Sequence, residues 1–157
     1  MGLAVTTFRP FKLSDVNAAA EMEASHQPQP WSEGVFLDEL AAENRTYLVA
    51  DEGGLVGFAG VMVIEDEAHV TNLLVGPDHR RQGIGRRLMG RLIELAIEQG
   101  ARHLTLEVRS ENSAARQFYS QFGLVPVGSR PGYYGDDDAL IMWAHDIDRS
   151  GYLEGLR

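Results

Sequence analysis

The feature that most constrains the fold of this chain is an apolar run that passes through an arginine-rich, glycine-containing turn into an amphipathic helix. The run Val70–Val75 has the character of a strand, and the apolar residues Leu88, Leu92 and Leu95 recur at helical spacing. Between them, residues 80–85 read RRQGIG. A strand, a turn with glycines and a helix start together direct backbone N–H groups at one place, an arrangement that suits a phosphate group.

The charge of this turn differs from that of the rest of the chain. Five arginines and no acidic residue lie between positions 80 and 91, in a protein whose formal net charge is −9. A multiply charged phosphate ligand is the simplest explanation, and a basic helix start without a ligand is the alternative. A nucleotide site of the P-loop kind is disfavoured because Lys12 is the one lysine of the chain, and Leu88 stands where a dinucleotide fingerprint has its third glycine.

Length and composition narrow the class of protein. A chain of 157 residues predicts one domain, placed over residues 1–147, with a flexible tail over 148–157. The lack of cysteine excludes disulfides, thiolate metal sites and a thiol nucleophile. No run is long enough to span a bilayer and no secretion signal is present, so we expect a cytoplasmic protein that does not bind membranes.

The acidic residues are concentrated in the first half. Residues 1–72 contain twelve acids against Arg9, Lys12 and Arg45, which disfavours nucleic acid and suits a basic peptide. Acidity that serves solubility alone is the alternative. The five histidines have no metal-ligand spacing, so we expect no metal.

Periodicity and turn residues predict an α+β fold with a mixed, mostly antiparallel central sheet, flanking helices and one strand–helix–strand crossover. Three residues are predicted helix caps, Ser14, Ser32 and Asn112, and Trp31 with Phe36 has the spacing of a hydrophobic staple. Strands are predicted over residues 3–8, 46–50, 55–64, 69–75, 104–108, 124–127 and 139–144. Helices are predicted over residues 15–24, 33–42, 83–99 and 113–121.

The segment Arg80-x-x-Gly83-x-Gly85 after an apolar strand resembles the diphosphate-binding signature of the GNAT acyltransferase superfamily. The resemblance covers residues 3–146. More narrowly, the chain resembles the RimI-type ribosomal-protein-alanine N-acetyltransferases in Pro30–Glu33, Glu107–Arg109 and Tyr133-Tyr134, and also in Asn112, Tyr119 and Asp138–Met142. It departs from them at Gln29, where a phenylalanine often precedes the Pro-Trp pair.

The resemblance implies the GNAT fold, with a splayed parallel strand pair, and acetyl-CoA as the acetyl donor. Its diphosphate would be held at the turn and its pantetheine amides would pair with the apolar strand. The implied cofactor residues are Leu73, Leu74, Val75, Arg80, Arg81, Gln82, Gly83, Ile84, Gly85, Arg86 and Asn112. The alternative for Leu73–Val75 is a plain core strand, and the alternative for Asn112 is a helix cap alone.

The resemblance also implies two catalytic residues. Glu107 would be the general base for an α-ammonium group, and Tyr119 the general acid for the leaving CoA thiolate. From the residues alone, Glu107 lies on the strand face opposite the leucines, and a solvent-facing glutamate paired with Arg109 is the stronger interpretation. Similarly, Tyr119 alone would be interpreted as a core tyrosine with a hydrogen-bonded hydroxyl.

The implied acceptor side contains Trp31, Glu33, Tyr133 and Tyr134. Core packing is the alternative for the three aromatic residues, and Glu33 would attract a basic peptide. Residues 136–138, three aspartates, would attract a basic peptide or form an ordinary solvated turn. The predicted activity is direct acetyl transfer to the N-terminal alanine of a protein. The alternatives are an acetyltransferase that acts on a small amine or a lysine side chain, and a non-catalytic CoA-binding module. The expected partner is the basic N-terminus of a ribosomal protein, and the enzyme is expected to be a monomer or weak dimer.

Overall fold

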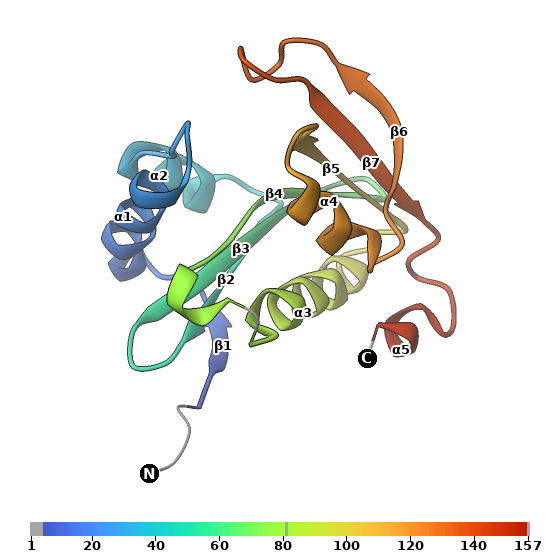
Figure 1. Cartoon of the computed structure of the whole chain (residues 1–157). Coiled ribbons are helices and arrows are strands. Elements are labelled where there is room, and N and C mark those ends of the chain that lie inside the picture. Colours follow the sequence, from blue (N-terminus) through green and yellow to red (C-terminus); the bar gives the residue numbers. More distant parts are fainter. Residues whose placement is uncertain (1–4, 81, 157) are drawn as a thin grey trace. The chain divides into compact units, whose positions relative to one another are not determined.

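The computed structural model describes residues 5–80 and 82–156 (Figure 1). Within these residues, seven strands form one mixed sheet in the order β1-β2-β3-β4-β5-β7-β6. The strands are β1 (Thr7–Pro10), β2 (Arg45–Asp51), β3 (Leu55–Ile64), β4 (Glu67–Val75), β5 (His103–Arg109), β6 (Val125–Arg130) and β7 (Ala139–His145). The helices are η1 (Leu13–Asp15), α1 (Val16–His26), α2 (Glu33–Ala41), η2 (Pro77–His79), α3 (Ile84–Glu98), α4 (Ser113–Ser120) and α5 (Tyr152–Gly155).

The predicted fold class is confirmed, including the crossover. Strands β4 and β5 are parallel and are connected along the chain through α3, whereas β1–β2, β2–β3, β5–β7 and β6–β7 are antiparallel. The parallel pairing runs from Glu67↔His103 to His69↔Thr105. Beyond it β4 continues to Val75 and β5 to Arg109.

The described chain divides into two compact units. Unit 1 contains the residues up to 62 and residues 71–95, and unit 2 contains residues 63–70 and those from 96 onward. The single domain expected over residues 1–147 stays a prediction. None of the helices in the described part of the chain has the length and hydropathy of a membrane span.

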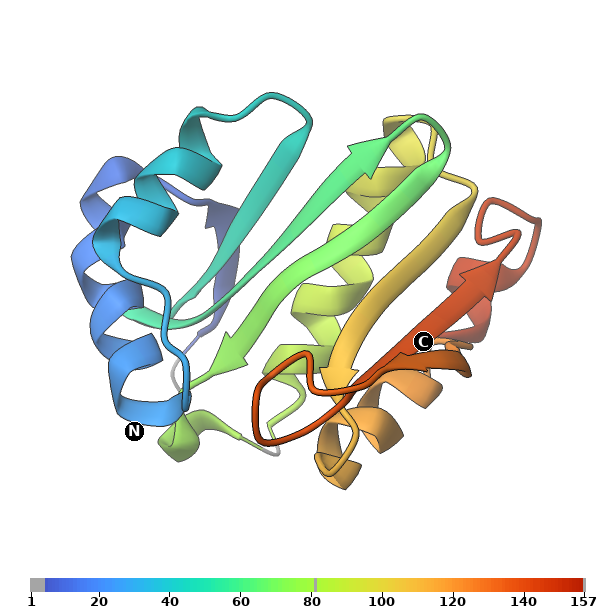
Figure 2. The same ribbon diagram turned by 90° about the horizontal axis from the view of Figure 1, so that it is seen from above.

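In unit 1, successive residues of β3 face opposite sides of the sheet, and each side is covered by helices. Phe58 is fully buried and its ring lies 5.4 Å from that of Phe36 in α2. The next residue toward the N-terminus, Gly57, faces the other way, and a Cβ there would lie 3.4 Å from the Leu88 side chain of α3. Figure 2 shows the result, with the blue helices α1 and α2 and the yellow-green helix α3 on opposite sides of the green strands.

The predicted cap at Ser14 is wrong. Helix α1 begins at Val16 after the 3₁₀ turn η1, in which Ser14 lies. The carboxylate of Asp15 accepts hydrogen bonds of 2.8 Å from the Lys12 backbone N–H and from both terminal guanidinium nitrogens of Arg9. A carboxylate bound to a guanidinium is a stronger acceptor than a serine hydroxyl, so Asp15 organises this turn.

The other two predicted caps are confirmed. Ser32 Oγ accepts from the Val35 N–H at 3.3 Å, and Asn112 Oδ1 accepts from the Ala115 N–H at 3.1 Å. The Trp31 and Phe36 rings of the predicted staple lie 5.3 Å apart. The chain therefore enters α2 along a path fixed by both a hydrogen bond and an apolar contact.

The first strand lies further along the chain than predicted. Instead of covering residues 3–8, β1 pairs with β2 from Thr7↔Asp51 to Pro10↔Leu48, and residues 1–4 lie outside the described part. The pairing includes Arg9, whose Nε donates to Asp51 at 2.8 Å. This ion pair between neighbouring strands extends β1 beyond its alternating apolar residues.

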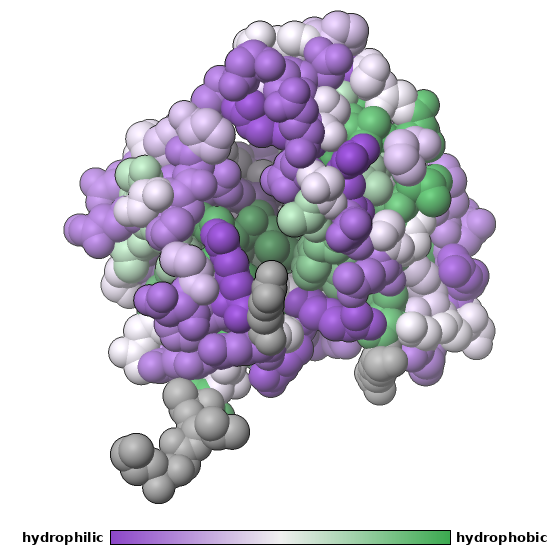
Figure 3. Space-filling view, in the orientation of Figure 1, coloured by the Kyte–Doolittle hydropathy of each residue, from purple (hydrophilic) through white to green (hydrophobic). Residues whose placement is uncertain are grey.

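In unit 2, β5, β7 and β6 form an antiparallel sheet in that order. The whole of β6 is exposed, with a register irregularity between Pro126 and Gly128. Figure 3 shows apolar surface over this strand, where Val125 and Val127 are 56% and 57% exposed. The outermost strands of the sheet, β1 and β6, each contain a proline, Pro10 and Pro126.

The C-terminal segment, expected to be a flexible tail, packs on unit 2 in its described part. Tyr152 begins the short helix α5 and is buried, and its hydroxyl donates to the Phe122 carbonyl at 2.5 Å. Ile147 is also buried, and its N–H donates to the Arg102 carbonyl. The sequence does not predict this anchoring, because a single tyrosine in a polar segment forms no periodic apolar pattern.

Candidate active site

The turn between β4 and α3 has the backbone form expected of an anion site. Gly83 has a φ of +77°, a conformation that favours glycine, and a Cβ built there would meet nothing within 4 Å. The Arg87 N–H donates to the Gly83 carbonyl at 3.0 Å, a hydrogen bond with helical spacing. The amides of Ile84 and Gly85 come earlier, in the first turn, where N–H groups have no partner within a helix. The predicted Arg81 lies outside the described residues.

The arginine side chains around this turn are partly engaged with the protein. Arg80 Nε donates to the Val75 carbonyl at 3.1 Å and so closes the turn onto the end of β4. The Arg87 guanidinium lies 4.5 Å from the centre of the Phe8 ring, and Arg91 pairs with Glu94 at 2.9 Å. The side chain of Gln82 donates to the Asp78 carbonyl at 3.4 Å. These contacts join the side chains around the turn to the end of β4, to η2, to β1 and along α3, while binding of a diphosphate at the turn stays a prediction.

The strand before the turn contributes side chains to the apolar core of unit 1. Leu74 is 6% exposed and belongs to the apolar core of unit 1, and Val75 is also buried. The Leu73 side chain is only partly buried, and its N–H donates to Asn72 Oδ1 at 2.9 Å. Leu74 and Val75 are therefore core side chains, while the pairing of Leu73–Val75 with pantetheine stays a prediction.

Of the residues predicted for the acceptor side, unit 1 contains Trp31 and Glu33. The Trp31 ring is partly buried against Phe36 and lies 6.5 Å from the Tyr47 ring. Glu33 is exposed in the first turn of α2, where a carboxylate interacts favourably with the helix dipole. Trp31 and Glu33 flank the cap residue Ser32. The hydrogen bond from the Val35 N–H to Ser32 Oγ therefore also restrains the backbone of these two residues.

In unit 2, Glu107 lies on β5 opposite Ile141 of β7. Its side chain is 28% exposed, and its Oε1 lies 3.2 Å from a terminal nitrogen of Arg130, the last residue of β6. The expected pairing with Arg109 is wrong, because Arg109 pairs with Asp136 at 2.8 Å instead. The Glu107 carboxylate is thus partly open to solvent and ion-paired across the antiparallel sheet of unit 2.

Tyr119 lies on α4, half-buried, with its ring 5.2 Å from the Phe118 ring. Its hydroxyl has no hydrogen-bond partner within residues 5–80 and 82–156, contrary to the core-tyrosine interpretation. Burial, aided by Tyr134, raises the pKa of Tyr119 to about 12. The phenol therefore keeps its proton at neutral pH, as a general acid must.

The loop between β6 and β7 presents the two predicted tyrosines. Their rings lie 5.0 Å apart, edge to face; Tyr133 is 54% exposed and Tyr134 half-buried. The Arg109 guanidinium lies 4.5 Å from the centre of the Tyr134 ring. Burial, followed by the charge of Glu107, raises the pKa of Tyr134. Tyr134 and Glu107 thus share one electrostatic environment in unit 2.

The three aspartates of this loop serve its structure. Asp136 pairs with Arg109, Asp137 accepts from the Ser110 hydroxyl at 2.6 Å, and Asp138 accepts from the Gly132 N–H at 2.8 Å. The first two contacts lower the pKa of Asp136 and Asp137. These carboxylates fold the loop, which agrees with the turn interpretation more than with attraction of a peptide.

Two residues that contact predicted site residues were not themselves predicted: Arg130, which contacts Glu107, and Glu23, which contacts Trp31. Nothing in the local sequence marks Arg130, because only strand pairing brings it to Glu107. Glu23 carried a signal: it follows Val16 and Ala19 at spacings of seven and four, on the buried stripe of α1. It is 2% exposed and accepts from the Trp31 N–H at 3.0 Å.

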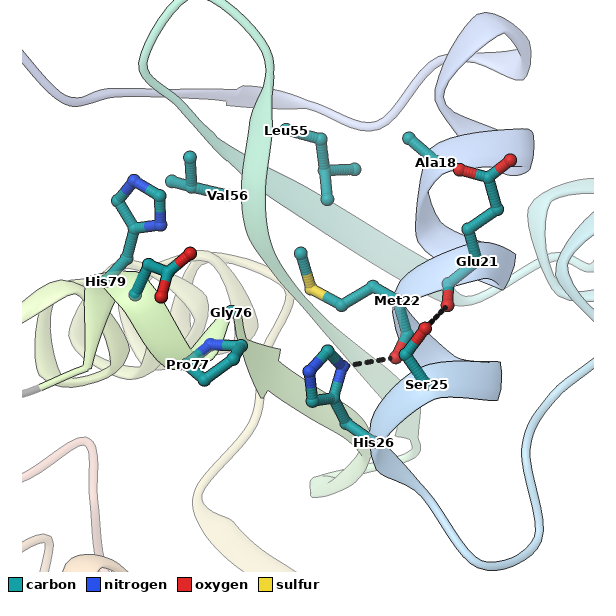
Figure 4. Close-up of a pocket in the computed structure, with 11 residues that line it drawn as sticks. Ala18, Glu21, Met22, Ser25, His26, Leu55, Val56, Gly76, Pro77 and His79 are labelled. Atoms are coloured by element: carbon teal, nitrogen blue, oxygen red, sulfur yellow. Dashed lines mark hydrogen bonds between the residues drawn. The ribbon is translucent and has the colours of Figure 1, made fainter.

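Unit 1 also contains a hollow of about 350 Å³ between α1 and the segment from β4 to η2 (Figure 4). In it, His26 Nδ1 and the Ser25 hydroxyl bond back to carbonyls of α1, those of Met22 and Glu21. None of the predicted site residues lines it. Its walls are formed by Ala18, Glu21, Met22, Ser25, His26, Leu55, Val56, Gly76, Pro77, Asp78 and His79.

The described residues contain no group of three or more histidine or acidic side chains arranged to hold a metal ion. A pair of histidines, His103 and His145, lies on neighbouring strands of unit 2 with their Nδ1 atoms 3.1 Å apart.

Comparison with known proteins fits this set of features. Residues 14–124 match the Acetyltransferase (GNAT) family. The chain is 34% identical over 142 residues to the [ribosomal protein bS18]-alanine N-acetyltransferase of Escherichia coli K12, covering 88% of this chain and 96% of that protein. It is 40% identical over 139 residues, 86% of this chain and 92% of the relative, to a Bacillus subtilis 168 protein provisionally assigned the same activity.

Solved structures agree with the fold. The crystal structure of the E. coli ribosomal-protein-S18-alanine N-acetyltransferase matches with a TM-score of 0.82 at 33% identity, covering 90% of this chain and 94% of that one. Ard1 from Thermoplasma volcanium matches with a TM-score of 0.84 at 28% identity, covering 91% and 98%. The chain is therefore an acetyltransferase of the GNAT family.

Proposed function

We propose that this protein transfers the acetyl group of acetyl-CoA directly to the N-terminal alanine of ribosomal protein bS18. The observation that carries the proposal is the likeness to relatives of that activity, which extends over nearly the full length of both chains. The relatives act on a protein, and the aromatic and acidic side chains assigned to the acceptor side here suit a peptide with a charged amine.

Acetyl-CoA fits the residues of the turn. The open backbone at Gly83 and the helix start at Ile84 and Gly85 would bind the diphosphate, helped by the charges of Arg80, Arg81 and Arg86. The amides of Leu73–Val75 would pair with the pantetheine, and Asn112 would contact the cofactor when its cap bond opens. Acetyl-CoA supplies an activated acyl group with a good leaving thiolate.

Glu107 is the base in this proposal. The α-ammonium of the acceptor must lose a proton before its nitrogen can attack, and the Glu107 carboxylate takes that proton. Because Arg130 already occupies one oxygen of this carboxylate, the ammonium competes with the guanidinium for it. Trp31, Glu33, Tyr133 and Tyr134 would orient the peptide so that its amine, rather than a lysine, is presented.

The neutral nitrogen then attacks the thioester carbon, and a C–N bond forms as the carbonyl oxygen becomes negatively charged. When this intermediate collapses, the C–S bond breaks and the electron pair leaves on sulfur. Tyr119 gives its proton to that thiolate, a transfer for which a phenol that is neutral at physiological pH is suited. The second proton, lost by the newly acylated nitrogen, passes through solvent and restores the phenol. No acyl-enzyme is needed, which agrees with a chain that has no cysteine.

The test uses the full chain with acetyl-CoA and a synthetic peptide of the bS18 N-terminus, followed by mass spectrometry to locate the acetyl group. We expect acetylation of the terminal alanine nitrogen and none on the same peptide with a blocked terminus. Transfer to lysine side chains or to polyamines would point to a different acceptor class. Tight CoA binding without transfer to any of them would favour a non-catalytic module.

A further inference from the structure

One face of the unit 2 sheet carries aromatic side chains that the proposed mechanism does not use. In β5 and β7, Leu106 and its partner Met142 are both buried. Because side chains alternate along a strand, Glu107 of β5 and Trp143 of β7 lie on the opposite face, where both are partly exposed. Figure 2 shows α4 and α5 behind these strands. The proposed base and Trp143 therefore share one accessible face of the sheet.

Four rings on this face contact one another in sequence. The Trp143 ring stacks on the His145 ring, with centroids 5.5 Å apart and planes 11° apart. It also lies edge to face with the His69 ring at 6.5 Å, and the His145 ring contacts that of His103 at 4.9 Å. Contiguous aromatic surface that stays accessible in a folded chain is typical of a contact site for another molecule.

Two carboxylates border these rings at the turn between β3 and β4. Glu67 Oε1 lies 3.6 Å from His69 Nε2, and Asp66 Oδ2 lies 3.7 Å from His103 Nε2. The two acidic side chains are 45% and 47% exposed. We call this set the Trp143 platform, and its members are Asp66, Glu67, His69, His103, Trp143 and His145.

The chemistry of the Trp143 platform fits a guanidinium group. A guanidinium stacks on aromatic rings and pairs with carboxylates through its forked N–H groups, and the platform offers both. Its carboxylates would repel a phosphate group instead. Arg102 of the same unit donates its backbone N–H to the Asp66 carbonyl, but its guanidinium pairs with Asp148 at 3.5 Å. An arginine from another chain would therefore meet rings and carboxylates that are already in place.

The distance from Glu107 determines which residue of an acceptor would reach the platform. Trp143 pairs with Thr105, two residues from Glu107 along β5, and His145 pairs with His103, four residues away. At about 3.3 Å per residue, these two positions lie about 7 and 13 Å from the base. An extended peptide advances by a similar rise, so with its terminal nitrogen at Glu107 its third and fifth residues would lie over these two positions.

We infer that the Trp143 platform is a second contact site for the acceptor, and that it binds an arginine between the third and the fifth residue of the acceptor chain. This inference rests on the proposed function, in which Glu107 receives the terminal amine of a basic protein. It adds a source of specificity that does not depend on the alanine itself. A basic residue downstream distinguishes the correct terminus from other chains that begin with alanine.

The test uses the full chain with acetyl-CoA and a series of peptides that begin with alanine and continue with glycine and serine. Each peptide carries one arginine, placed in turn at the second to the sixth residue, and its reference carries glutamine there. We expect arginine at the third to fifth residue to raise kcat/KM about two- to fivefold over glutamine, mainly through KM. Glu67→Gln should abolish this advantage, whereas Glu111→Gln, an exposed change in the same unit, should keep it.

A charge reversal keeps the test decisive if a variant is merely less stable. Glu67→Arg should invert the preference, so that glutamate at the same place in the peptide becomes a better acceptor than arginine. A destabilised variant would lose activity toward both peptides without changing their order. An equal advantage of arginine at every position, or a preference for arginine that persists in Glu67→Arg, would overturn the inference.

Binding without transfer separates this inference from the proposed function. An arginine peptide whose terminus is already acetylated cannot be an acceptor, but in an NMR titration it should still shift the indole N–H signal of Trp143, and less so in Glu67→Gln. Should the wild type fail to acetylate the bS18 peptide while this shift holds, the proposed function fails and the platform remains. Normal acetylation of the bS18 peptide, with no difference between arginine and glutamine at any position of the series, would reject the platform alone.

Discussion

A terminal nitrogen of Arg130 lies 3.2 Å from Oε1 of Glu107, so the proposed base is ion-paired to a cation of its own chain. The Arg130 side chain is 57% exposed, and its guanidinium also lies 5.8 Å from the centre of the Tyr133 ring. The arginine therefore occupies a position at the carboxylate that a substrate ammonium would need.

Replacing Arg130 with glutamine should lower the KM for the bS18 peptide by about two- to fivefold. The factor is small because an exposed ion pair contributes about 0.2–1 kcal/mol. Steady-state kinetics with varied peptide will measure it. Arg102→Gln is the matched control, since that side chain is equally exposed and pairs with Asp148 at 3.5 Å. A higher KM in Arg130→Gln would mean that the arginine helps to bind the acceptor.

Replacing Glu107 with glutamine should reduce kcat/KM by about 10²–10⁴ while CoA affinity, measured by calorimetry, stays the same. Glutamine keeps the shape of the side chain but cannot take the proton of the ammonium. Glu111→Gln, an exposed change in the same unit, should have no effect. Near-normal turnover of a homogeneous Glu107→Gln preparation would remove Glu107 from the mechanism.

Replacing Tyr119 with phenylalanine should lower kcat about a hundredfold by removing the acid. Tyr152→Phe is the control: it loses the hydrogen bond to Phe122 and should lower the melting temperature without lowering kcat. Full activity of Tyr119→Phe would assign the proton transfer to another group or to water.

The same two tyrosines define an alkaline transition. Burial raises the pKa of each from 10.0 to about 12. Because the folded-state pKa is the higher one, the stability that each neutral phenol contributes is complete below pH 10 and is lost as the pH rises toward 12. Denaturant titrations between pH 9 and about 12 should therefore show a smaller loss of stability in either phenylalanine variant than in the wild type.

Replacing Gly60 with alanine should destabilise unit 1 by about 1–3 kcal/mol. A Cβ at this position would overlap the ring of Tyr47, which cannot easily move because its hydroxyl is bonded to Glu39 and Thr71. Gly128→Ala on exposed β6 is the control, with nothing within 4 Å of the added carbon. Equal midpoints of urea unfolding for the two variants would show that the Tyr47 ring adapts.

Much of this architecture was predictable because its signals are local. The turn at Gly83, the caps at Ser32 and Asn112, and the staple of Trp31 on Phe36 each depend on residues within a few positions of one another. The crossover through α3 follows from the same kind of evidence, since a long amphipathic helix between two apolar runs favours parallel strands.

The predictions that failed missed contacts that exist only in the folded chain. Ser14 lost its predicted role to Asp15, whose partner Arg9 also pairs with Asp51, a contact that exists only because β1 pairs with β2. The partner of Glu107 was missed for the same reason, since Arg130 reaches it through strand pairing in unit 2. Glu23 has a helical spacing that marks it as buried, but the hydrogen bond that it accepts from the Trp31 N–H is not visible without the fold.

The prolines in the two outermost strands have a consequence for how the molecule behaves at high concentration. A proline has no N–H to offer, so neither Pro10 nor Pro126 can donate to a strand from another molecule, and the irregular register of β6 further interrupts that edge. The valines on β6 would otherwise make it an inviting template for aggregation. The two borders of this sheet are thereby poor starting points for polymerisation from one molecule to the next.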